Sequence, residues 1–344
     1  MPPRAPRKPS AAVSPERIFE AFNAYQRTEA LRAAIELDLF TAIDEGGATP
    51  AELSARLTAS ERGLRVLCDY LTILGLLSKD GARYALAPDA AVFLSRKSPA
   101  CLASVARFLG APRLMDGFRR LGEAVRRGGT VLDDGAGTTA PEHPVWVDFA
   151  RAMAPMMAAP AEAIADLLDV ADAPRLRVLD VAAGHGLFGL ALARRCPRAT
   201  VVALDWPQVL EVALENARAA GAADRYERLP GSAFDADFGT GYDVILLTNF
   251  LHHFDAPANE ALLRKVRAAL APKGRAVVLE FVPNPDRVSP PAAAAFSLTM
   301  LSSTPSGDAY TFAELERMLK NAGFARAALH GLGPSPQSAI VAEA

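Results

Sequence analysis

The chain has 344 residues, of which 51% are hydrophobic, and a formal net charge of -2. This length and composition allow two domains and a sizeable buried core, while the near-neutral charge excludes an extended surface for nucleic acid. The three cysteines (Cys68, Cys101 and Cys196) lack the spacing of a disulfide framework or zinc site, so we predict no bound metal. Because the chain has neither an apolar run of about 18 residues nor a signal-peptide core, we predict a cytoplasmic protein without a membrane span.

The N-terminal part of the chain predicts a helical domain after a short tail. Residues 1–17 are rich in Pro, Ala and Ser and predict a disordered tail. Residues 18–43 carry apolar side chains at helical spacing and predict two helices. A capping box begins at Thr49, a further helix spans residues 60–74, and residues 76–86 predict a hairpin. We therefore predict a winged-helix domain over residues 18–110.

A winged helix raises the question of DNA binding. The helix that would enter a DNA groove carries mixed charges rather than clustered Lys and Arg, so the pattern favours a dimerisation or substrate-lid role. A DNA-binding regulator remains the non-enzyme alternative.

Residues 111–172 predict a linker with helices that border a pocket. The segment is Gly-rich and irregular to about residue 144, apart from a helix over residues 115–127. Residues 144–168 predict a long helix whose bulky apolar side chains pack in the core or line an apolar ligand pocket: Trp146, Phe149, Met153 and Met157.

From residue 173 to the C-terminus, predicted strands alternate with helices. Alternation of this kind predicts an α/β fold with a doubly wound, mostly parallel sheet. The last two strands are close enough in sequence to pair antiparallel, which is unlike a dinucleotide-binding domain. Seven strands are predicted, at residues 177–181, 200–204, 225–229, 242–248, 274–281, 325–332 and 337–342.

The first of these strands ends at glycines and is followed at once by a helix. Gly184 and Gly186 allow unusual backbone angles and a close approach to a ligand. Asp205 ends the next strand, where a carboxylate can accept both ribose hydroxyls of a nucleoside cofactor. The same glycines satisfy the dinucleotide fingerprint G-x-G-x-x-G. Asp180 distinguishes the alternatives, because a dinucleotide strand normally carries an apolar residue at that position.

Together these segments resemble small-molecule O-methyltransferases that join an N-terminal winged-helix dimerisation domain to a class I methyltransferase domain. The family includes plant caffeate and bacterial polyketide enzymes, and the resemblance extends from about residue 18 to the C-terminus. Four segments carry it: VLDVAAGHG at 178–186, LDWPQVL at 204–210, NFLHHFD at 249–255 and VLEFVP at 278–283.

The resemblance implies S-adenosylmethionine as cofactor, a small-molecule acceptor and a homodimer. In the family an acidic residue at the position of Asp180 faces the cationic methionine moiety. The expected cofactor contacts are Asp180, Gly184, Gly186, Asp205, Trp206, Ser232, Ala233, Phe234 and Asn249. The expected substrate pocket adds four residues to those of the long helix: Phe250, His253, Phe296 and Met300.

The resemblance also implies a catalytic pair. His252 takes the position of the family's general base, and Glu280 matches the carboxylate that positions it. The chain departs from the family pattern in three places. His253 replaces an acidic residue, Ala309 stands where a second glutamate is expected, and Ser232 replaces an aspartate that contacts adenine. An alternative for His252 is a loop histidine that caps the following helix.

We therefore predict a methyltransferase that acts on a hydroxyl of a small aromatic or polyketide-like acceptor. A neutral His can deprotonate a phenol as the methyl group moves. Carbon or nitrogen methylation, and a homologue that binds the cofactor without methylating, remain alternatives.

Overall fold

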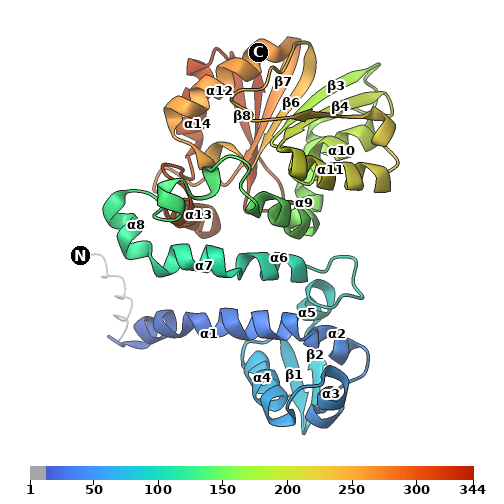
Figure 1. Ribbon diagram of the computed structural model, residues 1–344, viewed down its shortest axis with the longest axis vertical. Coiled ribbons are helices and arrows are strands. Elements are labelled where there is room, and N and C mark those ends of the chain that lie inside the picture. The colour runs from blue at the N-terminus through green and yellow to red at the C-terminus, as the bar shows by residue number, and fades with distance from the viewer. Residues whose placement is uncertain (1–12) are drawn as a thin grey trace, which may run out of the picture. The chain divides into compact units, whose positions relative to one another are not determined.

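The computed structural model describes residues 13–344 (Figure 1). Two compact units divide the chain, residues 1–110 and residues 111–344. Most of the predicted tail lies outside the described residues. Its last two residues are helical, because α1 begins at Glu16.

The first unit is helical with a two-stranded wing. Thr49 forms the predicted capping box, since its hydroxyl accepts from the Glu52 N–H and the Glu52 carboxylate accepts from the Thr49 N–H. The wing strands pair antiparallel. The elements are α1 (Glu16–Glu36), α2 (Leu39–Asp44), α3 (Pro50–Leu57), α4 (Glu61–Ile73), β1 (Leu77–Asp80), β2 (Arg83–Leu86), α5 (Pro88–Phe93) and α6 (Ala103–Leu109).

One apolar face of α1 is exposed in the part of the chain that the structure describes. Ile18, Phe19, Phe22 and Tyr25 are each at least 60% exposed. Large apolar side chains gathered on one exposed face are typical of an interaction surface.

The second unit begins with short helices and a glycine-rich segment. The predicted helix over residues 115–127 is divided into two, α7 (Pro112–Arg119) and α8 (Leu121–Arg127). Two 3-10 turns follow, η1 (Asp133–Gly135) and η2 (Gly137–Thr139), and then the long helix α9 (Val145–Leu168).

The second unit contains the predicted seven-stranded sheet, in the order β5-β4-β3-β6-β7-β9-β8. The first five strands in sequence pair parallel, and β9 pairs antiparallel with both β7 and β8. The predicted fold class is therefore confirmed. The strands are β3 (Leu176–Val181), β4 (Ala199–Asp205), β5 (Tyr226–Pro230), β6 (Tyr242–Thr248), β7 (Leu270–Glu280), β8 (Arg326–Gly331) and β9 (Ser338–Glu343).

Helices cover both faces of this sheet (Figure 1). Side chains from α9, α10 and α11 form the core on one face, and side chains from α12 and α14 form it on the other. The sequence did not predict α13, because its apolar residues lie on all sides and show no helical periodicity. The remaining elements are α10 (Leu187–Arg195), α11 (Pro207–Ala219), η3 (Ala223–Arg225), η4 (Leu251–His253), α12 (Ala256–Ala269), α13 (Pro291–Ser303) and α14 (Phe312–Asn321).

The parallel strands β3, β4, β6 and β7 all end at one edge of the sheet. Ligands bind outside this edge in doubly wound folds. No helix within residues 13–344 is both long and apolar enough to cross a membrane.

Candidate active site

The turn after β3 is fixed by a carboxylate from the neighbouring strand. Gly184 has a φ of 56°, which favours glycine. Asp205 accepts the Gly184 N–H at 2.8 Å through Oδ2 and the Trp206 N–H at 2.7 Å through Oδ1. Burial raises the pKa of Asp205 to about 6, although these two hydrogen bonds oppose the shift. Each oxygen keeps a further lone pair that can accept a ligand hydroxyl.

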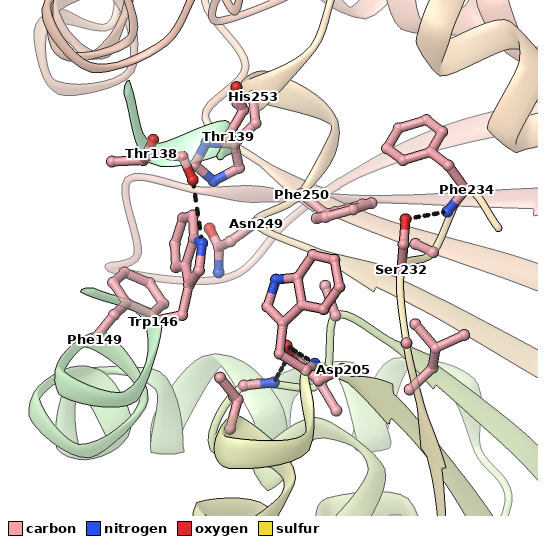
Figure 2. Close-up of a pocket in the computed structure, with 18 of the residues that line it drawn as sticks. Thr138, Thr139, Trp146, Phe149, Asp205, Ser232, Phe234, Asn249, Phe250 and His253 are labelled. Carbon is pink, nitrogen blue, oxygen red and sulfur yellow. Dashed lines mark hydrogen bonds between the residues drawn. The ribbon is translucent and has the colours of Figure 1, made fainter. Parts of the chain in front are cut away.

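A cavity of about 430 Å³ opens beside this carboxylate. Figure 2 shows the labelled side chains around it, with Trp146 and Phe149 from α9 and Phe250 and His253 from the segment after β6. Its volume lies in the range of small-molecule sites. The cavity brings together many of the residues predicted from sequence: Gly184, Asp205, Trp206, Ser232, Ala233, Phe234, Asn249, Trp146, Phe149, Phe250 and His253.

Two predicted cofactor contacts, Asp180 and Gly186, are not among the residues that line the cavity. The Asp180 side chain is fully buried, and its Oδ2 accepts the Gly189 N–H at 3.0 Å. Burial raises its pKa to about 7. A Cβ on Gly186 would lie 2.4 Å from the Tyr226 hydroxyl oxygen, so packing of that ring requires a glycine here. Both residues support the turn from within the protein.

The loop after β5 forms another wall of the cavity. The Ser232 hydroxyl accepts the Phe234 N–H at 3.1 Å. Lys265 on α12 donates to the carbonyl oxygens of Ala233 and Phe234 at 3.0 and 3.1 Å. The Phe234 ring packs edge-on against Phe254 with a centroid distance of 4.8 Å. Sequence reasoning missed Lys265, because a lysine on an amphipathic helix resembles any solvated residue.

The predicted catalytic residues meet behind the cavity. His252 Nδ1 lies 2.5 Å from Glu280 Oε2, and both side chains are buried. Glu280 Oε1 also accepts the N–H groups of Phe250 and His252, at 3.1 and 3.3 Å. One carboxylate at the end of β7 thus fixes both the ring of His252 and the backbone that follows β6. His252 itself is not among the cavity-lining residues.

The adjacent histidine, His253, does line the cavity. Its ring packs edge-on against Trp146 at a centroid distance of 5.1 Å and lies 4.3 Å from the ring of His252. Burial and the neighbouring His252 hold the pKa of His253 well below its ordinary value. His253 is therefore a neutral wall of the cavity at ordinary pH.

Four residues predicted for the substrate pocket are buried or packed elsewhere, and none lines this cavity. Phe296 on α13 stacks on Phe281 at 4.0 Å and packs edge-on against His252 at 4.9 Å. Met153 and Met300 are buried. Met157 is also buried, with its sulfur 3.5 Å from Asn249 Nδ2. Met157 therefore contacts Asn249, a residue that does line the cavity.

The alternative that His252 caps the following helix is wrong. Asp255 caps α12 instead, because its Oδ1 accepts the Ala258 N–H at 2.9 Å. Ala309, at the position of the second family glutamate, is fully buried and brings no charge to the site.

A wall formed by residues 138–141 was not predicted. It belongs to the glycine-rich segment before α9, whose sequence carries no motif. The Thr138 carbonyl accepts the Trp146 indole N–H at 3.1 Å (Figure 2), so the segment orients a predicted pocket residue.

Comparison with known protein families decides the class. Residues 118–325 match an O-methyltransferase domain, and residues 19–96 match an O-methyltransferase dimerisation domain. The chain belongs to the O-methyltransferase family. The predicted enzyme class is therefore confirmed.

Two relatives show the range of chemistry among similar proteins. The O-methyltransferase described here is 30% identical over 315 residues to the tetracenomycin polyketide synthesis 8-O-methyltransferase of Streptomyces glaucescens, covering 90% of this chain and 91% of that one. It is 26% identical over 311 residues to the L-tyrosine C(3)-methyltransferase of Streptomyces lavendulae, covering 86% of this chain and 82% of that one.

Solved structures agree with the fold. A candidate O-methyltransferase from Nostoc punctiforme PCC 73102 is 50% identical with a TM-score of 0.93, covering 97% of this chain and 100% of that one. Human N-acetylserotonin methyltransferase, solved with S-adenosylmethionine, is 21% identical with a TM-score of 0.84, covering 98% of this chain and 99% of that one.

Proposed function

We propose that this O-methyltransferase methylates a hydroxyl group of a small aromatic or polyketide-like acceptor, with His252 as general base. The observation that carries the proposal is the buried contact between His252 Nδ1 and Glu280 Oε2. A carboxylate that accepts from Nδ1–H leaves Nε2 of the ring as the proton acceptor and stabilises the imidazolium that forms.

The cavity has groups suited to S-adenosylmethionine, which supplies an electrophilic methyl group when bound. We assign Asp205 to the ribose hydroxyls, because its ordered carboxylate borders the cavity beside the glycine turn. We assign Trp206, Ser232 and Phe234 to the adenine end, where aromatic faces and polar groups lie together. Asp180 and Gly186 act indirectly by supporting the turn.

The residues of this chain have two tasks in the reaction. The cavity walls exclude water and align the acceptor hydroxyl with the methyl carbon. His252 takes the hydroxyl proton as the oxygen–carbon bond forms and the carbon–sulfur bond breaks. A phenol with an ordinary pKa near 10 is mostly protonated at neutral pH, so a base within reach accelerates the transfer.

His253 is the weaker candidate for the base. It borders the cavity, but its low pKa makes it a poor proton acceptor, and its Nδ1 has no hydrogen-bond partner among the described residues. We assign it to the acceptor wall, together with Trp146, Phe149 and Phe250.

Carbon methylation is the second candidate, favoured by the similarity to the L-tyrosine C(3)-methyltransferase. An aromatic carbon ortho to a hydroxyl becomes nucleophilic when that hydroxyl is deprotonated, so the same base would serve. The position of the new methyl group separates the two reactions.

We also propose that two copies pair through the first unit. The dimerisation family match covers residues 19–96, which include most of the exposed apolar face of α1. We assign catalysis to the second unit and assembly to the first.

Incubation with S-adenosylmethionine and a panel of phenols, naphthols, hydroxybenzoates and aromatic amines tests the proposal, with mass spectrometry to locate the methyl group. We expect methyl ethers from one class of phenolic acceptor. Methylation at carbon or nitrogen alone, or binding of S-adenosylmethionine with no transfer to any acceptor, would contradict it.

A further inference from the structure

The cavity wall formed by residues 138–141 belongs to a segment with little structure of its own. Residues 128–144 contain four glycines and two 3-10 turns of three residues each. A segment of this composition loses much conformational entropy when it is ordered, so contacts outside it must hold it in place.

Those contacts come from the C-terminal end of α13. The last carbonyls of a helix have no partner within the helix. Here the Ser302 carbonyl accepts the Thr130 hydroxyl at 2.8 Å, and the Ser303 carbonyl accepts the Thr138 hydroxyl at 3.2 Å. The Thr304 carbonyl, next in the chain, accepts the Thr130 N–H at 2.8 Å. Thr130 is completely buried, so this contact is shielded from water.

Glycines let the two backbones approach. A Cβ on Gly129 would lie 2.1 Å from the Pro305 carbonyl oxygen, and one on Gly137 would lie 2.1 Å from the Ser303 carbonyl oxygen. No side chain fits at either position without separating the segment from α13. We call the contacts of Thr130 and Thr138 with Ser302, Ser303 and Thr304 the threonine clasp.

The clasp connects two surfaces that pack against the two histidines. On one side, the Thr138 carbonyl holds the Trp146 indole, which packs against His253. On the other side, α13 carries Phe296, which packs against His252. The clasp therefore sets the separation between the aromatic wall of the cavity and the helix behind the catalytic histidine.

We propose that Thr138 is a positioning residue whose hydroxyl, through the threonine clasp, fixes Trp146 and the acceptor end of the cavity. The effect on acceptor recognition rests on the proposed function. The effect of the Thr138 hydroxyl on the position of Trp146 can be measured without turnover. Thr138 touches the cavity as well, but its hydroxyl acts through α13.

The chain provides a spectroscopic reporter for this proposal. It has two tryptophans, Trp146 and Trp206, and both line the cavity. In a Trp206→Phe background, emission comes from Trp146 alone. Acrylamide quenching of that emission measures how tightly the wall covers the indole.

Thr138→Val keeps the shape of the side chain and removes the hydroxyl donor. We expect the acrylamide quenching constant of Trp146 to rise at least about twofold. The loss of one hydrogen bond shifts the equilibrium between the ordered and the displaced wall by about two- to tenfold. Thr139→Val is the matched control for this readout. Thr139 also lines the cavity, but its hydroxyl donates to Ala136 within the same turn, so its loss should leave the quenching unchanged.

Gly129→Ala tests the same clasp by a different route, since its methyl group must displace the segment from Pro305. With Trp206 present, both clasp variants should raise the KM of the acceptor about three- to tenfold, with kcat and the affinity for S-adenosylhomocysteine within about twofold of the parent. If Gly129→Ala does not fold, Thr138→Val decides.

Folded Thr138→Val protein with parental quenching would overturn the proposal, as would equal quenching in Thr138→Val and Thr139→Val. Absence of methylation for every acceptor would contradict the proposed function alone, because the quenching comparison needs no turnover.

Discussion

His252 Nδ1 and Glu280 Oε2 lie 2.5 Å apart, although 27 residues separate the two in sequence. The contact forms because β6 and β7 are neighbouring parallel strands that end at the same edge of the sheet. Glu280 ends β7, and His252 lies in the 3-10 turn just after β6.

Glu280→Gln tests the positioning role of this carboxylate. The amide can still accept a backbone N–H through its oxygen, but it no longer offers a charged acceptor to Nδ1. We expect turnover to fall about 10- to 10³-fold while the affinity for S-adenosylhomocysteine, measured by calorimetry, changes little. The loss should be smaller for acidic phenols, which are already ionised. An equal loss on all phenols would indicate general misfolding of the site.

Asp205 should make cofactor affinity depend on pH. The ionised carboxylate is the form that accepts ribose hydroxyls, and burial raises its pKa to about 6. Affinity for S-adenosylhomocysteine should therefore be constant above about pH 7 and weaken as the pH falls through 6. Asp205→Asn should bind about ten- to a hundredfold more weakly at pH 8 and show no such change with pH. A wild-type affinity that is flat from pH 5 to 8 would contradict the assignment to Asp205.

Asp180 should make the stability of the second unit fall as the pH rises. Its folded pKa is raised to about 7, whereas an unfolded Asp titrates near 4. Between these values the folded state binds a proton that the unfolded state has lost, so this contribution is fully present below about pH 4 and is lost as the pH rises to 7. Asp180→Asn keeps an acceptor for the Gly189 N–H and removes the titration.

Denaturant unfolding at pH 5 and pH 8 measures this effect. The free energy of unfolding of Asp180→Asn, measured relative to that of wild type, should be higher at pH 8 than at pH 5 by on the order of 2–4 kcal/mol. If the difference in free energy of unfolding between the two proteins were the same at pH 5 and pH 8, Asp180 would not titrate between these pH values.

The exposed face of α1 should mediate pairing of two copies. A stable homodimer of this kind buries about 2,000 Å² or more, and Phe19 and Phe22 are 60% and 73% exposed in the single chain. We expect a dimer by light scattering at micromolar concentration, and monomers for Phe19→Glu/Phe22→Glu. Asn23→Glu introduces one negative charge at a polar position of the same helix, and this variant should stay dimeric. A monomeric wild-type protein would exclude this assembly.

Some features could be predicted because they follow from local patterns. The strands were visible as short apolar runs between glycines and helices, and their parallel order brought Asp205, His252 and Glu280 to one edge. The glycine turn was visible for the same reason. Asp180 was predicted to contact the cofactor directly, but its side chain is buried beneath the turn. A sequence shows that a residue ends a strand but not which side of the turn its carboxylate faces.

Other features depend on contacts that leave no local pattern. The helix α13 is apolar on all sides, so no periodicity marks it. The wall at Thr138 is held by carbonyl oxygens about 165 residues away, and Lys265 reaches the loop at Ala233 from another helix. Such long-range contacts to backbone atoms depend on the folded geometry rather than on a motif.

The central claim is base-assisted oxygen methylation, and the dependence of turnover on acceptor acidity tests it most directly. Wild type, His252→Ala and His253→Ala would be compared on a series of phenols of one shape and graded pKa, with S-adenosylhomocysteine affinity as the control for folding. We expect His252→Ala to lose about 10²- to 10⁴-fold in turnover on weakly acidic phenols and progressively less as the phenol becomes acidic. The turnover of His253→Ala should be lower than that of wild type by the same factor on every phenol of the series. Near-wild-type turnover of His252→Ala on every phenol, or a loss that does not vary with phenol acidity, would contradict the account.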